Sequence, residues 1–442
     1  MSRPRILFLY TNEWDTLEIS RSHVNEQFDV IYEGFDRYNV FNRLQLAFFD
    51  PLRFVDRMVK TYGGTIEGVT SNDDHWGALL SSLIAQALGL PGIDPKVFVT
   101  CQHKALFRQA ESRINPTQVP WFDVLEPETA QDKLHALRYP AFVKPVKSSF
   151  SVLARHVHTP QDMQQAIHFT PYEQLAQHVA LRSVHQLHQH VMGKQIQMPS
   201  LRAMLVESPM RGYQINIDGY ALNGQIHFVG IVDSHMFPGT HAFKRFEFPS
   251  RLNPDAAEAA YRTARRLLEG LGYNHGFFNV EAFVQRDPTT HEWAIHIIEV
   301  NPRMARQLSS LYANGLGFDC WHALLALSCG APVKAAQGGL KPHAASFVRR
   351  SFDGQLPAAP SAAQVALAQQ RFPDMRLQLY LKPRGLGKAR EIKWVGSYRY
   401  AVTNLAATSR GELFAQYDQL IEALGWLPDG HEVHQPEPCT SL

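Results

Sequence analysis

The stretch Gly276-Phe-Phe-Asn-Val-Glu281, followed after a polar loop by His296-Ile-Ile-Glu299-Val-Asn301-Pro-Arg303, decides the fold of this chain. The two pieces predict apolar strands over 278–284 and 294–300 that pair as a hairpin. Each strand carries one glutamate among apolar residues, where an unpaired carboxylate is strongly disfavoured. We therefore expect a positive charge beside both glutamates.

Pairing of the two strands would bring the glutamates together. Glu281 and Glu299 can then share one face, and Asn301, two residues further on, lies on the face of Glu299. Two carboxylates and an amide oxygen suit Mg²⁺, which prefers hard oxygen ligands and keeps positions for phosphate oxygens. Arg303 continues the alternation and could hold a phosphate or a carboxylate. The alternative is a structural ion network in which Arg303 or Arg306 pairs with the glutamates.

The segments upstream predict a fold built from several units. Strands and helices alternate over the first hundred residues, which indicates a small parallel sheet covered by helices, and no GxGxxG motif marks a dinucleotide site. A turn-rich run at 89–95 ends this part. Further along we expect helices at 75–88, 100–113 and 255–272, and strands at 6–10, 29–32, 65–70, 139–145, 201–206, 213–220 and 225–232. The Asn223-Gly224 pair predicts a hairpin turn, and the Pro- and Ala-rich stretch 356–366 predicts a linker or a surface loop.

Composition excludes several classes of protein. The 442 residues are 45% hydrophobic and 19% charged, as in a folded chain of two to four units. Forty-three basic and forty-one acidic residues leave a net charge of +2 without blocks of one sign, so we expect no nucleic-acid partner. The apolar run after Met1 is too short for a signal or spanning helix, and four scattered cysteines fit a reduced compartment. We expect a cytoplasmic protein without membrane contact.

The segment 276–303 resembles the metal-binding end of ATP-grasp enzymes, in which a Glu on one strand and a Glu-x-Asn-x-Arg on the next hold magnesium ions that bridge the ATP phosphates. The resemblance covers roughly residues 101–330, with its motifs in the right order. It implies a mixed α/β and α+β fold: a Rossmann-like domain at 1–100, and an ATP-grasp domain of two α+β subdomains at 101–330. The nucleotide-binding lid would be about 137–207, and a C-terminal α+β extension would follow at 331–442.

The resemblance assigns roles to matching residues. Glu281, Glu299 and Asn301 would bind the metal, and Arg303 would be the catalytic residue that stabilises the acyl-phosphate or the tetrahedral adduct. Lys104 matches the lysine that opens the family's region, and Lys144 matches the one in its Pro-x-x-x-Lys-Pro strand. Both reach ATP phosphates in the family, although a lysine taken alone is more typical of the solvated surface.

Further nucleotide contacts follow from the same match. In place of a glycine-rich loop stands 146–151, whose Ser148, Ser149 and Ser151 could hold phosphate oxygens or form an ordinary serine turn. The backbone of Glu207 and Ser208 would bond adenine. Met210 would pack on the adenine ring, and Gln214 stands in the place of a ribose-binding acid. Arg245, with Lys244 and His241, would lie near the triphosphate; the alternative is that these three residues form a mobile basic loop.

The activity implied is that of a carboxylate–amine ligase similar to amino-acid and dipeptide ligases of the carnosine-synthase-like group. ATP would phosphorylate a carboxylate to an acyl-phosphate, which an amine attacks, with release of ADP and phosphate. The cofactors would be ATP and Mg²⁺, with Mn²⁺ as a substitute, and the partners small carboxylates and amines, with a homodimer left open. The alternatives are a bicarbonate-activating, carboxylase-like enzyme and a non-catalytic nucleotide-binding module. A helix face with His178, His185, His188 and His190 predicts solvated side chains rather than a metal site.

Overall fold

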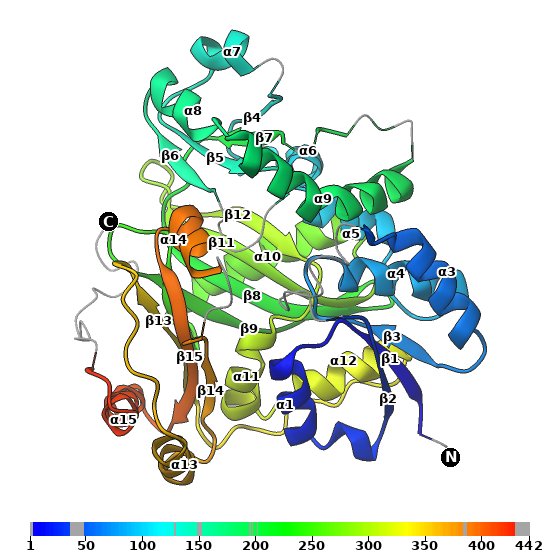
Figure 1. Ribbon diagram of the computed structural model, residues 1–442, viewed down its shortest axis with the longest axis vertical. Helices are drawn as coiled ribbons and strands as arrows, with labels where there is room; N and C mark the ends of the chain where they lie inside the picture. The colour runs from blue at the N-terminus through cyan, green and yellow to red at the C-terminus, as the bar shows by residue number, and fades with distance from the viewer. Residues whose placement is uncertain are drawn as a thin grey trace.

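The protein is described here by a computed structural model that covers residues 3–35, 48–127, 130–147, 153–193, 196, 198–200, 202–382 and 387–428. Three sheets organise it (Figure 1): an N-terminal parallel sheet, a small antiparallel sheet, and a central sheet of eight strands. Within the described residues, no helix combines the length and apolar character needed to cross a bilayer.

The N-terminal unit has the parallel alternation that the sequence predicts. Its strands lie in the order β2-β1-β3, both pairs parallel. They are β1 (Arg5–Leu9), β2 (Asp29–Glu33) and β3 (Gly68–Thr70), with helices α1 (Glu13–Arg21), α3 (Pro51–Tyr62) and α4 (Gly77–Leu88). Asp73 fixes the start of α4, because its Oδ1 accepts from the backbone N–H of Trp76 at 2.8 Å and of Gly77 at 3.1 Å.

The helix predicted at 100–113 is two helices. Helix α5 (Pro95–Gln102) ends at His103, whose φ of −95° and ψ of 104° are extended, and α6 (Lys104–Ile114) begins directly after it. The His103 side chain caps α6 by accepting from the N–H of Leu106 at 3.4 Å. The break makes Lys104 the first residue of α6 and turns this end of the helix toward the central sheet.

The small sheet has the order β4-β7-β5-β6, all antiparallel. Its strands are β4 (Phe122–Leu125), β5 (Ala141–Pro145), β6 (Arg155–Val157) and β7 (Met204–Glu207), with helices α7 (Ala130–Lys133), α8 (Pro160–Ala166) and α9 (Pro171–Met192). Helix α9 reaches across to the N-terminal unit (Figure 1), where Val184 and Leu187 are buried in its hydrophobic core. The Trp76 Nε1–H donates to Ser183 Oγ at 2.9 Å and ties the two units together.

The central sheet has the order β12-β11-β8-β9-β10-β13-β15-β14. Its strands are β8 (Tyr213–Leu222), β9 (Gln225–Met236), β10 (Phe243–Phe248), β11 (Gly276–Arg286), β12 (Trp293–Asn301), β13 (His343–Ser351), β14 (Arg376–Leu379) and β15 (Tyr398–Ala407). The expected turn joins β8 and β9, with positive φ at Asn223 (53°) and Gly224 (82°). Helix α10 (Pro254–Gly270) packs on one face through an apolar cluster that includes Leu267 and Phe278.

The part beyond residue 330 extends the same sheet, because β13 pairs with β10 and the last two strands follow it. Its helices are α13 (Ala362–Arg371), α14 (Gly387–Val395) and α15 (Arg410–Ala423), while α11 (Ser309–Leu316) and α12 (Cys320–Ser328) precede it. The linker or surface loop expected at 356–366 is wrong from residue 362 onward, where α13 begins. There Ser361 caps α13 by accepting from the N–H of Gln364 at 3.2 Å.

Candidate functional site

The acidic hairpin has the geometry that its spacing predicts. Strands β11 and β12 are antiparallel, with Glu281 directly opposite Glu299 and Asn279 opposite Asn301. A β-bulge follows Glu281, so the pairing register shifts immediately beyond the acid pair. The Asn301 Nδ2–H group lies 3.3 Å from Glu281 Oε1 and 3.5 Å from Glu299 Oε1. Two carboxylates and one amide therefore share a single face at the end of the hairpin.

The two arginines of the alternative ion network pair with other acids. Arg306 Nη1 lies 2.8 Å from Asp15 Oδ2 in the N-terminal unit. Arg303 Nε lies 3.3 Å from Asp74 Oδ1, and Arg303 Nη2 donates to Asn301 Oδ1 at 3.4 Å. Both guanidinium groups thus bind other carboxylates. Among the described residues, Lys104 pairs with the acids, since its Nζ lies 3.2 Å from Glu299 Oε2.

The two glutamates differ in their electrostatics. Burial, and then the charge of Glu299, raise the pKa of Glu281 to about 8. Burial also opposes ionisation of Glu299, but Lys104 and Lys144 outweigh it and lower the pKa of Glu299. One carboxylate is therefore held ionised, while its neighbour keeps a proton until more positive charge arrives.

This donor set fits a hard divalent cation. Glu281 and Glu299 lie directly opposite each other on neighbouring strands. The proton on Glu281 neutralises a negative charge that a bound divalent cation could neutralise instead. Asn301 presents its NH₂ group to the glutamates and its oxygen to Arg303. A half turn of this amide would present the oxygen to a metal instead. Within the described residues no cluster of three or more His, Cys, Asp or Glu side chains forms another metal site.

A polar row that the sequence analysis missed continues from the acid pair onto β8. Asn279 Nδ2 donates to Asn216 Oδ1 at 2.9 Å and to Asp218 Oδ1 at 3.1 Å, and the Tyr312 hydroxyl donates to Asp218 Oδ2 at 2.6 Å. Burial raises the pKa of Asp218 to about 6. The signal was present in the alternation of Asn216 and Asp218 with apolar neighbours along one strand. Gln214, predicted near ribose, precedes Asn216 by two residues and shares this face of β8.

The second lysine belongs to a fully buried ion network. Lys144 Nζ lies 2.6 Å from Glu207 Oε1, and Arg108 Nε lies 2.9 Å from Glu207 Oε2. Arg108 also pairs with Glu111 at 2.5 Å and donates to the Ile297 carbonyl of β12 at 2.8 Å. Burial works against the charge on Glu207, but Arg108 and Lys144 outweigh it and lower the pKa of Glu207 to about 2. Arg108, which the sequence analysis missed, thus joins β7 of the small sheet to the central sheet.

The residues predicted at adenine lie beside this network. The Ser208 N–H donates to the Trp121 carbonyl at 2.9 Å, so that donor is already used within the protein. Met210 Sδ lies 4.0 Å from Arg108 Nη2. Ser148, Ser149 and Ser151 lie outside the described residues.

Arg245 does not join the acid pair. Its segment is strand β10 rather than a mobile loop, and Arg245 Nε lies 2.5 Å from Glu247 Oε1. Glu247 also binds Arg410 at 2.8 Å and His235 at 3.2 Å. Three strand spacings separate β10 from β11, or roughly 14 Å. The structure therefore places Arg245 in an ion network within the sheet.

The histidine-bearing face of α9 is not simply solvated. His188 is 1% exposed, and its Nε2 lies 2.9 Å from Gln102 Oε1 of α5. Burial, followed by the charges of His103 and Lys147, lowers the pKa of His188 well below its ordinary value. His188 therefore acts as a neutral contact between α9 and α5, whereas His190 remains exposed.

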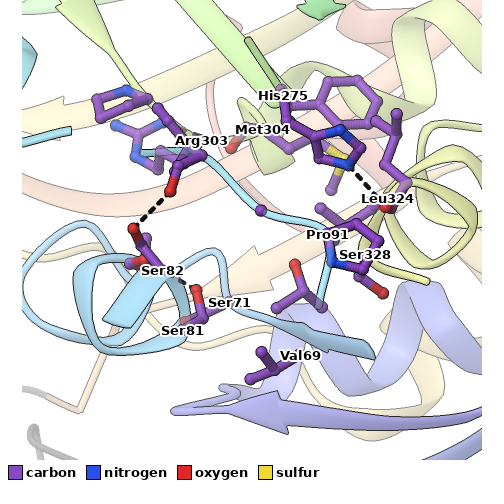
Figure 2. A pocket seen from close by; sticks show the side chains of 18 of the residues that line it. Val69, Ser71, Ser81, Ser82, Pro91, His275, Arg303, Met304, Leu324 and Ser328 are labelled. Carbon is purple, nitrogen blue, oxygen red and sulfur yellow. Dashed lines mark hydrogen bonds between the residues drawn. The ribbon is translucent and has the colours of Figure 1, made fainter. Parts of the chain in front are cut away.

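A small cavity of about 60 Å³ lies between the N-terminal unit and the central sheet. Figure 2 shows Ser71, Ser81 and Ser82 on one side, with His275, Arg303 and Met304 opposite. Its hydroxyls are satisfied within the protein: Ser71 Oγ donates to the Leu9 carbonyl and Ser82 Oγ to the Ile93 carbonyl, both at 2.7 Å. This volume accommodates a few water molecules but not a nucleotide base.

Comparison with known proteins agrees with this architecture. Residues 137–310 match the family model for the ATP-grasp domain. The L-amino acid ligase of Bacillus licheniformis superposes with a TM-score of 0.67 at 14% identity, over 96% of this chain and 98% of that one. Carboxyaminoimidazole ribonucleotide synthase of Aspergillus clavatus, solved with ATP, gives 0.63 at 14% identity over 96% and 98%. Biotin carboxylase of Campylobacter jejuni gives 0.61 at 13% identity over 95% and 91%.

The protein thus has the fold of the ATP-grasp proteins. More particularly, residues 137–310, which contain the hairpin with Glu281 and Glu299, are the part that matches the ATP-grasp domain model.

Proposed function

We propose that this protein is an ATP-dependent ligase that converts a carboxylate into an acyl-phosphate and joins it to an amine, releasing ADP and phosphate. The observation that carries the proposal is the meeting of Glu281 and Glu299 on one face of the hairpin, with Lys104 3.2 Å from Glu299. The structural match to an L-amino acid ligase supports amines of the amino-acid class as the first to test.

The residues can be given roles that follow from their surroundings. Glu281, Glu299 and Asn301 would hold Mg²⁺, which when bound supplies positive charge beside the phosphates of ATP. Lys104 keeps Glu299 ionised through their 3.2 Å contact. Arg303 lies at the end of β12 with its fork between Asn301 and Asp74, where it can bind the negative charge that develops on the acyl group.

The small sheet and the central sheet meet where ATP would lie. Lys144 and Arg108 both hold Glu207 at the end of β7, and Arg108 continues to the backbone of β12. This network is rigid because all of its charged groups are buried and paired. We infer that it fixes the distance between the adenine end of the site, near Met210, and the phosphate end, near Glu299.

The test is a screen for ADP and phosphate release over paired carboxylic acids and amines with Mg·ATP. We expect release that requires both an acid and an amine, and its loss in Glu299→Gln. Glu292→Gln, an exposed glutamate in the loop of the same hairpin, is the matched control and should keep full activity. Turnover that requires bicarbonate and no amine would select a carboxylase-type reaction. Absence of ADP release with every pair would count against the proposal.

A further inference from the structure

Three charged side chains from three parts of the molecule meet beside the acid pair. Asp74 precedes α4 of the N-terminal unit, Lys147 follows β5 of the small sheet, and Arg303 follows β12 of the central sheet. Arg303 Nε lies 3.3 Å from Asp74 Oδ1. Among the charges that act on Lys147, Asp74 has the largest effect, followed by Lys104, Glu299 and Arg303. Neither Asp74 nor Lys147 was a candidate from sequence.

Lys147 is a buried ammonium group without a direct anionic partner. The residue is 7% exposed, and within the described parts of the chain its Nζ makes no hydrogen bond and no ion pair within 4.0 Å. Burial is the main cause that lowers the pKa of Lys147 to about 8, while Asp74 opposes the shift. An amine in such a position is stabilised by a bound anion, because burial of a charge is costly unless it is paired.

The position of Asp74 is fixed by a chain of hydrogen bonds from α9. Gln102 Nε2 donates to the Asp74 carbonyl at 2.5 Å, and Gln102 Oε1 lies 2.9 Å from His188 Nε2. Both Gln102 and His188 are buried. The backbone next to Lys147 is fixed as well, since the Lys104 N–H donates to the Val146 carbonyl at 3.0 Å. The three charges therefore belong to a built site rather than to mobile surface chains.

The local charges favour one kind of ligand. Lys104 pairs with Glu299 and Arg303 with Asp74, whereas among the described residues no carboxylate lies within 4.0 Å of the Lys147 ammonium. An ammonium in this position suits a carboxylate. Lys104 already lies beside the metal-binding pair, where phosphates are expected.

We propose that Lys147 and Arg303 form the subsite for the carboxylate that this enzyme activates, with Asp74 aligning the two cations. The inference rests on the proposed function but assigns the substrate end of the site to residues that come from three separate sheets. Arg303 would serve both parts of the site, because its guanidinium can contact the substrate carboxylate and also the phosphate that this carboxylate receives. Lys147 then binds the second carboxylate oxygen.

The experiment measures carboxylate and nucleotide binding separately. Lys147→Met, Lys147→Arg and the control Lys133→Met, a half-exposed lysine on α7 of the same unit, are compared with the wild-type protein. Calorimetry on the complex with Mg²⁺ and a non-hydrolysable ATP analogue follows titration with a panel of amino acids and small carboxylic acids. We expect Lys147→Met to weaken carboxylate binding at least tenfold and nucleotide binding less than twofold. Lys147→Arg should retain more affinity than Lys147→Met, and Lys133→Met should match wild type.

The outcomes separate the two proposals. If a panel acid binds in a Lys147-dependent manner but no ADP is released with any amine, the subsite stands and the ligase proposal fails. If ADP is released and the KM for the acid is unchanged in Lys147→Met, the ligase proposal stands and the subsite fails. A loss of nucleotide affinity with unchanged carboxylate affinity would assign Lys147 to the phosphates of ATP. No binding of any panel acid to the wild-type complex at millimolar concentration would overturn the subsite.

Discussion

Replacing Glu281 by Gln should stabilise the metal-free protein while removing its activity. Burial and Glu299 raise the pKa of Glu281 from 4.5 to about 8, so the folded state favours the protonated, neutral carboxyl. The stability from this carboxyl is fully present below pH 4.5 and is lost as the pH rises through 8. Gln mimics the neutral form at every pH, so the variant escapes that loss.

The magnitude follows from the shift. At about 1.36 kcal/mol per pKa unit, the whole shift corresponds to at most about 5 kcal/mol above pH 8. Solvent reaches the pair, since the Glu299 side chain is 25% exposed. We therefore expect Glu281→Gln to gain about 1–3 kcal/mol in free energy of unfolding at pH 8.5, and less than about 1 kcal/mol at pH 5.

Urea unfolding of the metal-free proteins at pH 5 and pH 8.5 measures the effect, with Glu292→Gln as the surface control. Addition of Mg·ADP at pH 8.5 should raise the stability of the wild type and much less that of Glu281→Gln, since the variant lacks one metal ligand. The reasoning is refuted if Glu281→Gln is less stable than wild type at pH 8.5, or if its gain is the same at both pH values. It is refuted as well if Mg·ADP stabilises both proteins equally.

Three further predictions test other parts of the site. Because Glu281 keeps a proton at pH 7 without metal, binding of Mg·ADP should release close to one proton there and none at pH 9.5, which calorimetry in buffers of different ionisation enthalpy measures. Glu247→Gln breaks a buried network with Arg245 and Arg410, so it should lower the free energy of unfolding in urea by about 2–4 kcal/mol and leave the affinity for Mg·ADP unchanged. Weakened nucleotide binding would instead support a role of Arg245 at the nucleotide site. Arg108→Met leaves Glu207 and Glu111 without their guanidinium and should cost at least about 3 kcal/mol, and an unchanged thermal midpoint would contradict the network described here.

The acidic hairpin could be predicted from sequence because its signal is local. A period of two places Glu281 and Glu299 on the two strands of one hairpin, and the apolar residues around them leave few ways to satisfy a carboxylate. The pairing of Glu281 with Glu299 confirms this geometry. The fold of the first hundred residues was predictable for the same reason, since alternating strands and helices have distinct periods.

The rest of the site depends on contacts between distant parts of the chain. Arg108 reaches Glu207, 99 residues further on, and Ile297, 189 residues further on, and nothing in its own helix indicates either partner. The break at His103 was hidden because α5 and α6 have no proline or glycine between them, so a continuous helix fitted the pattern equally well. Asp74 and Lys147 become site residues only when three sheets are brought together.

Arg245 shows how a partner on the same strand bears on a predicted role. The resemblance placed Lys244 and Arg245 near the triphosphate, with a mobile basic loop as the alternative. Strand alternation places Arg245 and Glu247 on the same side of β10, two residues apart, where they pair at 2.5 Å. A guanidinium with a buried carboxylate two residues away is already engaged, and this spacing was visible in the sequence.

Four acids in the strands of this protein differ in their charged partners: Glu207, Asp218, Glu247 and Glu281. Arg108 and Lys144 lower the pKa of Glu207 to about 2, and Arg410 with Arg245 does the same for Glu247, in both cases against the effect of burial. Burial instead raises the pKa of Glu281 to about 8 and of Asp218 to about 6, because no guanidinium contacts either of these carboxyls among the described residues. A carboxyl that folding leaves without its cation is one that an external cation can stabilise, and Glu281 lies opposite a second carboxylate that shares the same face.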